Sequence, residues 1–289
     1  MIPVLDGLGQ IIDRYDGFIL DLWGVIHDGA SAYPHSADTL ARLKAAGKRT
    51  VMLSNAPRRA AALIAAMEGM GIPRHLYDEV MSSGEAVNRE LVTRRDPWYA
   101  RLGRRCWHLG PERDRNVFEE TGLDVVDTVE QADFILNTGP DKFEETVADY
   151  EDVLRRGAAR GLPMVCANPD LVVIRENRRL VCAGALAERY RQLGGEVSWR
   201  GKPDPAIYGL CLDLLGVDRG RVLGVGDAFH TDIAGARTAG IDSLFVTGGI
   251  HGQEIGLAQY GDHPDPARVT AVAAAHDERP TWAIRAFVW

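Results

Sequence analysis

The chain has 289 residues, a length that suits one large domain or two smaller ones. Hydrophobic residues make up 46% and charged residues 26%, which are ordinary values for a globular protein. The formal net charge of −8 argues against nucleic-acid binding, because that function needs a basic surface to neutralise phosphates.

The first residues, the apolar runs and the cysteines favour a protein that is neither exported nor embedded in a membrane. The first residues lack a basic stretch leading into an apolar one, so we expect no signal peptide. No apolar run approaches the roughly 20 residues that a membrane helix requires. Cys106, Cys166, Cys182 and Cys211 lie far apart without a CxxC pair, which favours reduced thiols and a cytoplasmic location.

Strand-like and helix-like segments alternate in the two outer parts of the chain. Residues 17–25 are a short apolar run ended by turn formers, typical of a buried strand, and 36–48 form an amphipathic helix pattern. The remaining outer segments are a strand at 50–57, a helix at 58–71, a stretch at 196–203 that reaches Gly-Lys-Pro, a helix at 206–216, a strand at 221–228, a helix at 231–240 and a strand at 241–249. Strands separated by helices predict a parallel sheet covered on both faces.

The middle of the chain has an α/β pattern of its own. Strands are expected at 105–110, 133–139 and 162–170, and a helix at 144–161. Because the outer parts together make a sheet, we interpret the middle as an inserted domain. Its expected range is 82–195, and residues 1–81 plus 196–289 are then the core.

The last residues, Trp282 to Trp289, are apolar and aromatic. They fit either a late strand or a contact between copies of the chain. The sequence leaves the oligomeric state open, a dimer included.

Polar residues follow the predicted core strands at the points where each strand ends. They are Asp21, Ser54 with Asn55, Lys202 before the third helix, Asp227, and then Asp232. Each one alone has an ordinary explanation as a helix cap, a turn residue or a solvated loop residue. Ligands collect at the carboxyl ends of the strands of an open parallel sheet, so the set as a whole favours one shared crevice. Carboxylates and an ammonium group suit a divalent cation such as Mg²⁺ and a phosphate.

These segments resemble the four motifs of the haloacid dehalogenase (HAD) superfamily of phosphohydrolases. In chain order they are DLWGV with Asp21, LSNAP with Ser54, GKP with Lys202, and GVGDAFHTDIAGA with Asp227 and Asp232. The insert resembles the large α/β cap of subfamily IIA, which includes nitrophenyl-phosphatase-like and nucleotide-phosphatase-like enzymes. The runs CANPD (166–170) and GALAERYRQLGG (184–195) also look like that subfamily. The resemblance implies a Rossmann-like, parallel-sheet α/β core with an inserted α/β cap domain.

The resemblance also implies residue roles and a cofactor. Asp21 would be the nucleophile that forms an aspartyl-phosphate. Ser54 and Asn55 would hold phosphoryl oxygens, and Lys202 would neutralise the nucleophile and the phosphate together. The Mg²⁺ ligands would be Asp21, the main-chain carbonyl of Trp23, Asp227 and Asp232.

One position departs from the family pattern. The phosphatases of the family carry a second Asp two residues after the nucleophile, and this Asp protonates the leaving group and activates water. At that position this chain has Trp23. General acid–base catalysis contributes about 10²–10⁴-fold to a rate, so its loss matters. Three explanations stay open: a substrate with a good leaving group, a substitute acid–base group such as His27 or His230, or a protein that binds phosphate and turns over slowly or not at all.

The leading hypothesis is a Mg²⁺-dependent phosphohydrolase of small phosphorylated metabolites. The alternative is a catalytically weak or inactive homologue that binds a phosphorylated ligand. Trp23 either fills space beneath the insert or stacks its indole on a planar substrate group. Asn168, which follows a strand of the insert, is expected to contact substrate or to belong to a hinge. A dinucleotide-dependent oxidoreductase is excluded because no GxGxxG turn follows the first core strand.

Overall fold

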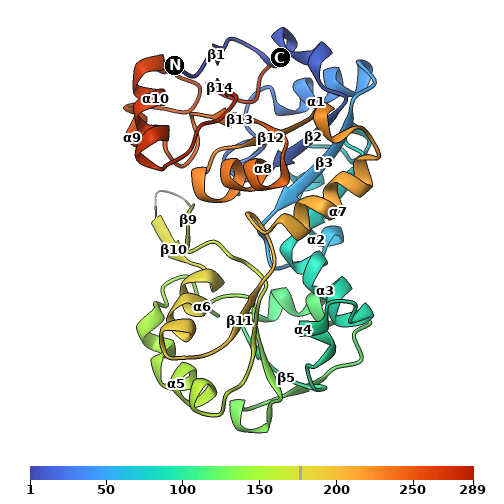
Figure 1. The fold of residues 1–289 in the computed structure, drawn as a ribbon, viewed down its shortest axis with the longest axis vertical. Coiled ribbons are helices and arrows are strands. Elements are labelled where there is room, and N and C mark those ends of the chain that lie inside the picture. Colours follow the sequence, from blue (N-terminus) through green and yellow to red (C-terminus); the bar gives the residue numbers. More distant parts are fainter. Residues whose placement is uncertain (176–177) are drawn as a thin grey trace. The chain divides into compact units, whose positions relative to one another are not determined.

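The computed structural model describes residues 1–175 and 178–289. The chain divides into two compact units (Figure 1). The first unit comprises Met1–Ser54, Leu63–Met81 and Lys202–Trp289, and the second comprises Asn55–Ala62 and Ser82–Gly201. Among the described residues, no helix is both long enough and apolar enough to cross a bilayer.

A seven-stranded sheet forms the centre of the first unit, with the order β1-β14-β13-β12-β2-β3-β4. All neighbouring pairs from β1 to β3 in this order are parallel. The predicted α/β fold with a parallel sheet is therefore confirmed. The strands are β1 (Val4–Leu5), β2 (Gly17–Asp21), β3 (Arg49–Ser54), β4 (Glu79–Ser82), β12 (Val222–Gly226), β13 (Asp242–Val246) and β14 (Trp282–Ile284).

Helices connect these strands, and apolar side chains fill the space between the layers. The helices are α1 (Ser36–Ala45), α2 (Ala60–Gly69), α7 (Pro205–Leu215), α8 (Ala234–Ala239), α9 (Gly252–Ile255) and α10 (Pro266–Ala275). All five residues of β2 and all five of β12 are buried, as their continuous apolar runs require in a sheet covered on both faces. One buried cluster joins Phe229, Phe245 and Val269.

The C-terminal segment is a late strand. β14 lies between β1 and β13, so both ends of the chain belong to the first unit (Figure 1). After it the chain packs back on the N-terminal segment, where the Leu8 N–H donates to the Val288 carbonyl at 2.9 Å.

The second unit is built on a five-stranded parallel sheet with the order β11-β8-β7-β5-β6. Its strand β11 lies beyond residue 195, the expected end of the insert. The elements of this unit are α3 (Ser83–Thr93), α4 (Pro97–Ala100), β5 (Arg105–Leu109), β6 (Asp124–Val126), β7 (Phe134–Asn137), α5 (Glu151–Ala159), β8 (Met164–Cys166), β9 (Val172–Arg175), β10 (Arg178–Val181), α6 (Ala183–Gln192) and β11 (Val197–Trp199). β9 and β10 pair with each other as an antiparallel hairpin.

Alternate residues of this second sheet face two separate cores. Phe134 and Leu136 pack with Val87 and Leu91 of α3, whereas Ile135 packs in the other cluster, with residues of α5 and α6. Helices α5 and α6 lie side by side (Figure 1). All four cysteines of the chain are free and buried, in agreement with the expectation of unpaired thiols.

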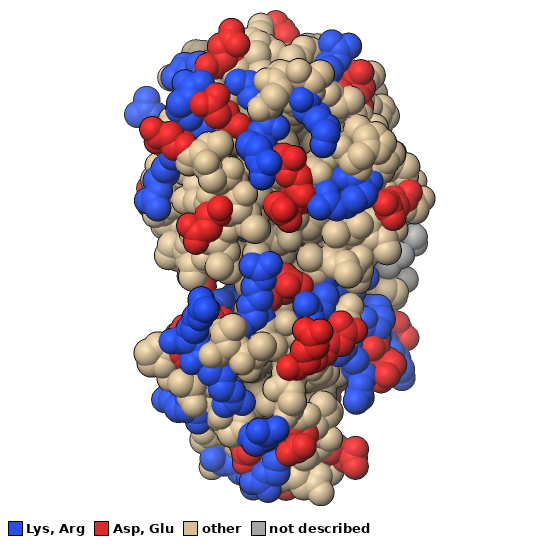
Figure 2. Space-filling model, turned by 90° about the vertical axis from the view of Figure 1, so that its right-hand side faces the viewer, with Lys and Arg blue, Asp and Glu red and all other residues tan. Residues whose placement is uncertain are grey.

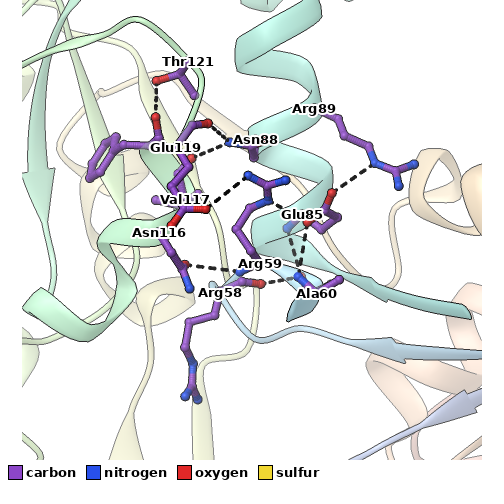
Figure 3. A network of polar contacts seen from close by, with 12 residues as sticks. Arg58, Arg59, Ala60, Glu85, Asn88, Arg89, Asn116, Val117, Glu119 and Thr121 are labelled. Carbon is purple, nitrogen blue, oxygen red and sulfur yellow. Dashed lines mark hydrogen bonds and ion pairs between the residues drawn. The ribbon is translucent and has the colours of Figure 1, made fainter. Parts of the chain in front are cut away.

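Residues 55–62 belong to the second unit, and a polar network joins Arg59 and Ala60 of this segment to its neighbours there (Figure 3). The Nε of Arg59 donates to Oε2 of Glu85 at 2.7 Å, and the Ala60 N–H donates to the same oxygen at 3.2 Å. The Arg59 N–H also donates to the side-chain carbonyl of Asn116 at 3.3 Å. Because Glu85 lies in the first turn of α3, these contacts join the segment to that helix.

Several predicted elements are shorter than expected. The strand at 162–170 is limited to β8 (Met164–Cys166), and the helix at 231–240 to α8 (Ala234–Ala239). The helix at 144–161 is wrong in its first turns: α5 begins at Glu151, after a 3₁₀ turn at Val147–Tyr150. Thr146 and Asp149 form a capping box that starts this turn and so prevents an earlier helix start. The strand at 17–25 ends at Asp21, after which the backbone turns at Gly24 with φ +80°.

Acidic and basic side chains are interspersed on the face shown in Figure 2. Several exposed ion pairs of the described residues lie within one helix, such as Arg42 with Asp38 at 2.8 Å and Arg156 with Asp152 at 3.1 Å. Exposed pairs of this kind contribute little to stability, about 0–1 kcal/mol each.

Candidate active site

The carboxyl ends of three neighbouring strands of the first unit carry polar residues expected from the sequence. β2 ends at Asp21, β3 ends at Ser54, and Asp227 follows directly after β12. Asp21 is in register with Leu53, the residue before Ser54. Because the strands run parallel, these three residues lie at one edge of the sheet.

Three carboxylates and one ammonium group converge there. One oxygen from each of Asp21, Asp227 and Asp232 lies within 4.8 Å of the others, and the three residues are only 6–7% exposed. The Nζ of Lys202 lies 2.6 Å from Oδ1 of Asp21 and 2.8 Å from Oδ1 of Asp232. Three ionised carboxylates and one ammonium leave two negative charges, which a divalent cation balances.

Main-chain amides orient each carboxylate. The Leu22 N–H donates to Oδ1 of Asp21 at 2.7 Å, and the Ala228 N–H donates to Oδ2 of Asp232 at 3.1 Å. Oδ2 of Asp227 accepts from the Ile250 N–H at 2.7 Å. Hydrogen bonds to ionised acceptors are about twice as strong as neutral ones, so the backbone stabilises the charged carboxylates.

Two glycines make room for Asp227. A Cβ atom on Gly24 or on Gly249 would lie 2.0 Å from Oδ2 of Asp227. Gly24 also has φ +80°, a left-handed conformation that side chains disfavour. The backbone of two loops, at Gly24 and at Gly249, therefore lies directly against the Asp227 carboxylate.

The environment of Asp21 favours a bound cation. Burial, and then the Asp232 carboxylate, raise the pKa of Asp21 well above its usual value, while Lys202 opposes the increase. Closely spaced carboxylates stay ionised together when a cation compensates them. Oxygen ligands and a net double negative charge fit Mg²⁺, so the residues present suit the cation expected from the sequence.

Trp23 lies two residues after Asp21, where the sequence departs from the family pattern. Its indole is half-buried and meets the ring of His27 edge-on, with centroids 5.7 Å apart. A Cβ atom on Gly29 would lie 2.1 Å from the indole, so the ring packs directly against that backbone. The 27–29 loop therefore fixes Trp23.

The two histidines considered as substitutes lie in different surroundings. His27 is buried, and burial lowers its pKa to about 4. Its Nδ1 accepts from the Gly29 N–H at 3.0 Å, so the imidazole is neutral near pH 7 and is a poor proton donor. His230 is exposed, in a π-helical turn at Phe229–Ile233.

The remaining predicted residues divide between the two units. Ser54 belongs to the first unit, at the strand edge that carries Asp21. Asn55 and Asn168 belong to the second unit, where both contact Asp170. Asn55 Nδ2 donates to Oδ1 of Asp170 at 2.8 Å, and Oδ1 of Asn168 accepts from the Asp170 N–H at 3.0 Å.

The sequence did not single out Gly249 and Ile250. They follow β13, and the rule applied to the other core strands could have found them, because Thr-Gly-Gly ends the predicted strand at 241–249. Their contribution comes from the backbone, which a search for polar side chains does not detect.

Two family models match the chain. One, described as haloacid dehalogenase-like hydrolase, matches residues 18–124, a range that includes Asp21 and Ser54. The other, described as HAD-hydrolase-like, matches residues 199–275, a range that includes Lys202, Asp227 and Asp232.

Solved structures and curated relatives are similar along most of the chain. A hydrolase of the haloacid dehalogenase-like family from Brucella suis 1330 is 34% identical, with 99% of this chain and 100% of that chain covered and a TM-score of 0.84. A 4-nitrophenylphosphatase from Thermotoga maritima is 25% identical, with 96% of each chain covered and a TM-score of 0.71. An acid sugar phosphatase from Staphylococcus aureus is 24% identical over 242 residues, or 82% of this chain and 88% of the relative.

Proposed function

Since this chain belongs to the haloacid dehalogenase-like hydrolases, we propose that it is a Mg²⁺-dependent phosphatase of small phosphorylated metabolites. The membership expected from the four motifs, in subfamily IIA, is confirmed. The names of two relatives, a 4-nitrophenylphosphatase and an acid sugar phosphatase, support aryl phosphates and sugar phosphates as the substrates to test.

The ion pair between Lys202 and Asp21 is the observation that carries this proposal. A carboxylate of Asp21 attacks phosphorus, forming a P–O bond to the side chain while the bond to the leaving oxygen breaks. Water then hydrolyses the resulting aspartyl-phosphate and releases inorganic phosphate. Catalysis of this kind depends mainly on positioning and charge neutralisation, which a buried ion pair held by a backbone amide supplies.

Lys202 acts on two charges at once. Its ammonium group lies between Asp21 and Asp232, so it reduces their mutual repulsion and attracts the incoming phosphate. Ser54, at the same strand edge, contributes its hydroxyl to the phosphoryl oxygens. Asn55 is proposed for the same role from the family resemblance, and its amide is at present bonded to Asp170.

Asp21, Asp227 and Asp232, with the main-chain carbonyl of Trp23, would hold Mg²⁺. When bound, the cation neutralises phosphoryl charge as a Lewis acid. The amides of Ile250 and Ala228 keep the Asp227 and Asp232 carboxylates in place for this task.

Trp23 indicates which substrates suit this site. Without a carboxylate at this position, and with His27 neutral near pH 7, a leaving group that departs without a proton is favoured. Aryl and acyl phosphates have such leaving groups, whereas alkyl phosphates do not. We therefore propose that the protein prefers the first two classes.

The second unit is proposed as the cap that determines specificity. In its segment around Asn168 and Asp170, the Asp170 N–H donates to Oδ1 of Asn168 at 3.0 Å, and a Cβ on Gly184 would lie only 2.2 Å from the Pro169 carbonyl oxygen. A segment packed and hydrogen-bonded in this way can present polar groups to a substrate.

Trp23 also favours a second candidate function. A homologue that lost its acid–base carboxylate but kept the four charged residues could bind phosphorylated ligands and turn them over slowly or not at all. The same residues would bind the ligand in both functions. Only a measurement of turnover distinguishes the phosphatase from the binding protein.

Phosphate release from an aryl phosphate, an acyl phosphate and a panel of alkyl phosphates distinguishes these functions, with Mg²⁺ and with chelator. The proposal predicts Mg²⁺-dependent release from the first two classes and little from the third. Equal release from all three would mean that another group replaces the missing carboxylate. No release from any of them, together with measurable phosphate binding, would favour the binding protein.

A further inference from the structure

A second group of metal-binding side chains lies in the first unit: His251, Glu254 and His276. Nδ1 of His251 lies 2.9 Å from Oε2 of Glu254. Nε2 of His276 lies 3.0 Å from each oxygen of the same carboxylate. One ligand atom from each residue lies within 4.8 Å of the other two, so a single ion could contact all three.

The local fold brings these residues together. His251 precedes α9 and Glu254 lies within it, and a spacing of three residues places both on one side of a helical turn. His276 directly follows α10. The two helices lie side by side (Figure 1), which brings the third ligand to the first two.

The ring of Phe229 packs against the imidazole rings of both His251 and His276. Its ring centroid lies 4.6 Å from that of His251 and 4.9 Å from that of His276, and Phe229 is fully buried. The two imidazoles lie 4.7 Å apart. Because packing fixes the rings, a cation would bind without a large rearrangement.

We propose that His251, Glu254 and His276 bind one divalent transition-metal ion of the zinc type, with solvent completing its coordination. Two imidazoles and one carboxylate suit Zn²⁺, Co²⁺ or Ni²⁺ better than Mg²⁺. Neighbouring ligand atoms of a tetrahedral zinc site lie about 3.4 Å apart by its bond lengths. The nitrogen–oxygen distances of 2.9–3.0 Å are close to that value. The side chains of Glu254 and His276 are 44% and 34% exposed, so solvent can reach the ion.

The protonation states agree with ligation. Burial lowers the pKa of His251, which keeps the imidazole neutral. Hydrogen bonds from His251 and His276 lower the pKa of Glu254 in the absence of an ion, and a bound cation would take their place in stabilising the ionised carboxylate.

The ion would replace the hydrogen bonds that join Glu254 to His251 and His276. One further contact would be lost. Nε2 of His251 accepts a long hydrogen bond, 3.5 Å, from the Phe229 N–H. A metal ion on Nδ1 places the imidazole proton on Nε2, so this weak bond cannot persist. The proposed zinc site also adjoins the candidate active site. His251 follows Ile250, whose N–H donates a hydrogen bond to Asp227. A bound ion would therefore stabilise the segment that positions Asp227.

Zinc titration of the full chain without a histidine tag tests the proposal, by isothermal calorimetry in excess Mg²⁺. We expect one Zn²⁺ per chain for the wild type. Glu254→Gln and His276→Ala should each weaken binding by more than about tenfold, since even outer-sphere changes cost about 10–100-fold. His263→Ala, which removes an exposed histidine elsewhere in this unit, is the matched control and should bind as the wild type does.

Two outcomes overturn the proposal. One is a wild type that binds no Zn²⁺ under these conditions. The other is binding by both folded variants, checked by circular dichroism, that is as tight as wild-type binding. Asp227→Asn shows whether zinc then occupies the carboxylate site instead, and the visible spectrum of bound Co²⁺ reports imidazole ligation independently of activity.

Discussion

The Nζ atom of Lys202 lies 2.6 Å from Oδ1 of Asp21, in an ion pair whose two side chains are only 5% and 8% exposed. A second contact, 2.8 Å to Asp232, makes Lys202 the compensating cation for two carboxylates. Removing one partner of a buried pair leaves an uncompensated charge, which costs far more than breaking a surface pair.

Lys202→Met should therefore reduce the free energy of unfolding by about 3–5 kcal/mol when Mg²⁺ is chelated. Added Mg²⁺ should restore part of the loss, because a ligand that binds only the folded state stabilises it. Urea unfolding with chelator and with Mg²⁺ measures both effects. Lys44→Met, on the exposed side of α1, is the control, and an equal effect of the two changes would contradict the assigned role.

Gly249→Ala should weaken Mg²⁺ binding at least about tenfold, because the new Cβ would lie 2.0 Å from Oδ2 of Asp227 and displace that carboxylate. Gly209→Ala in α7 meets no atom within 4 Å and should leave Mg²⁺ affinity unchanged, with up to about 1 kcal/mol of added stability. Calorimetric Mg²⁺ titration compares the two. Equal affinities would mean that Asp227 does not bind the cation.

Trp23→Asp should raise the turnover of alkyl phosphates, by up to about 10²–10⁴-fold, since it restores a proton donor. Turnover of aryl phosphates should change little, because their leaving groups need no proton. Trp23→Phe keeps an aromatic ring and serves as the control. If alkyl turnover of Trp23→Asp stays at the wild-type level while aryl turnover persists, the absent carboxylate is not what limits the reaction.

Stability should fall in acid partly because of His108 in the second unit. Burial lowers the pKa of His108 to about 4, against about 6.5 in an unfolded chain. Between these values the unfolded state binds more protons, so stability is complete above pH 6.5 and decreases as the pH falls to about 4. At about 1.4 kcal/mol per pKa unit, the loss from this residue reaches about 3 kcal/mol.

Urea unfolding of His108→Asn from pH 7 to pH 4 measures that contribution. The variant should lose less stability than the wild type over this range. The stability of the variant should still decrease somewhat in acid, because burial also lowers the pKa of His27 to about 4. His263→Asn is the exposed control, and a variant curve parallel to the wild-type curve would show that His108 is not responsible.

The charged residues of the site could be predicted from the sequence because they come after strands of an α/β pattern, two of them directly at or after a strand end. Asp21 and Asp227 lie at the ends of the neighbouring strands β2 and β12. In the sequence each is recognisable as a carboxylate that ends or follows an apolar run. Lys202 and Asp232 lie further from a strand end, in a loop and a turn, so the sequence indicated them only as members of the whole set, and the family resemblance then implied their roles.

The rest depends on tertiary contacts. Gly249 is recognisable as part of the site only once its distance to Asp227 is known. His251 and His276 come together because α9 packs on α10, and the chain between them carries no metal-binding spacing. Residues 55–62 belong to the second unit through the pairing of Arg59 with Glu85, which composition does not reveal (Figure 3).

The most direct test of the account is Mg²⁺-dependent phosphate release from an aryl phosphate by the wild type and by Asp21→Asn. The substitution preserves size but removes the nucleophile, so release should fall by at least about 10³-fold while phosphate binding stays measurable. Release by Asp21→Asn at the wild-type rate would contradict the assignment of Asp21 and, with it, the proposed mechanism.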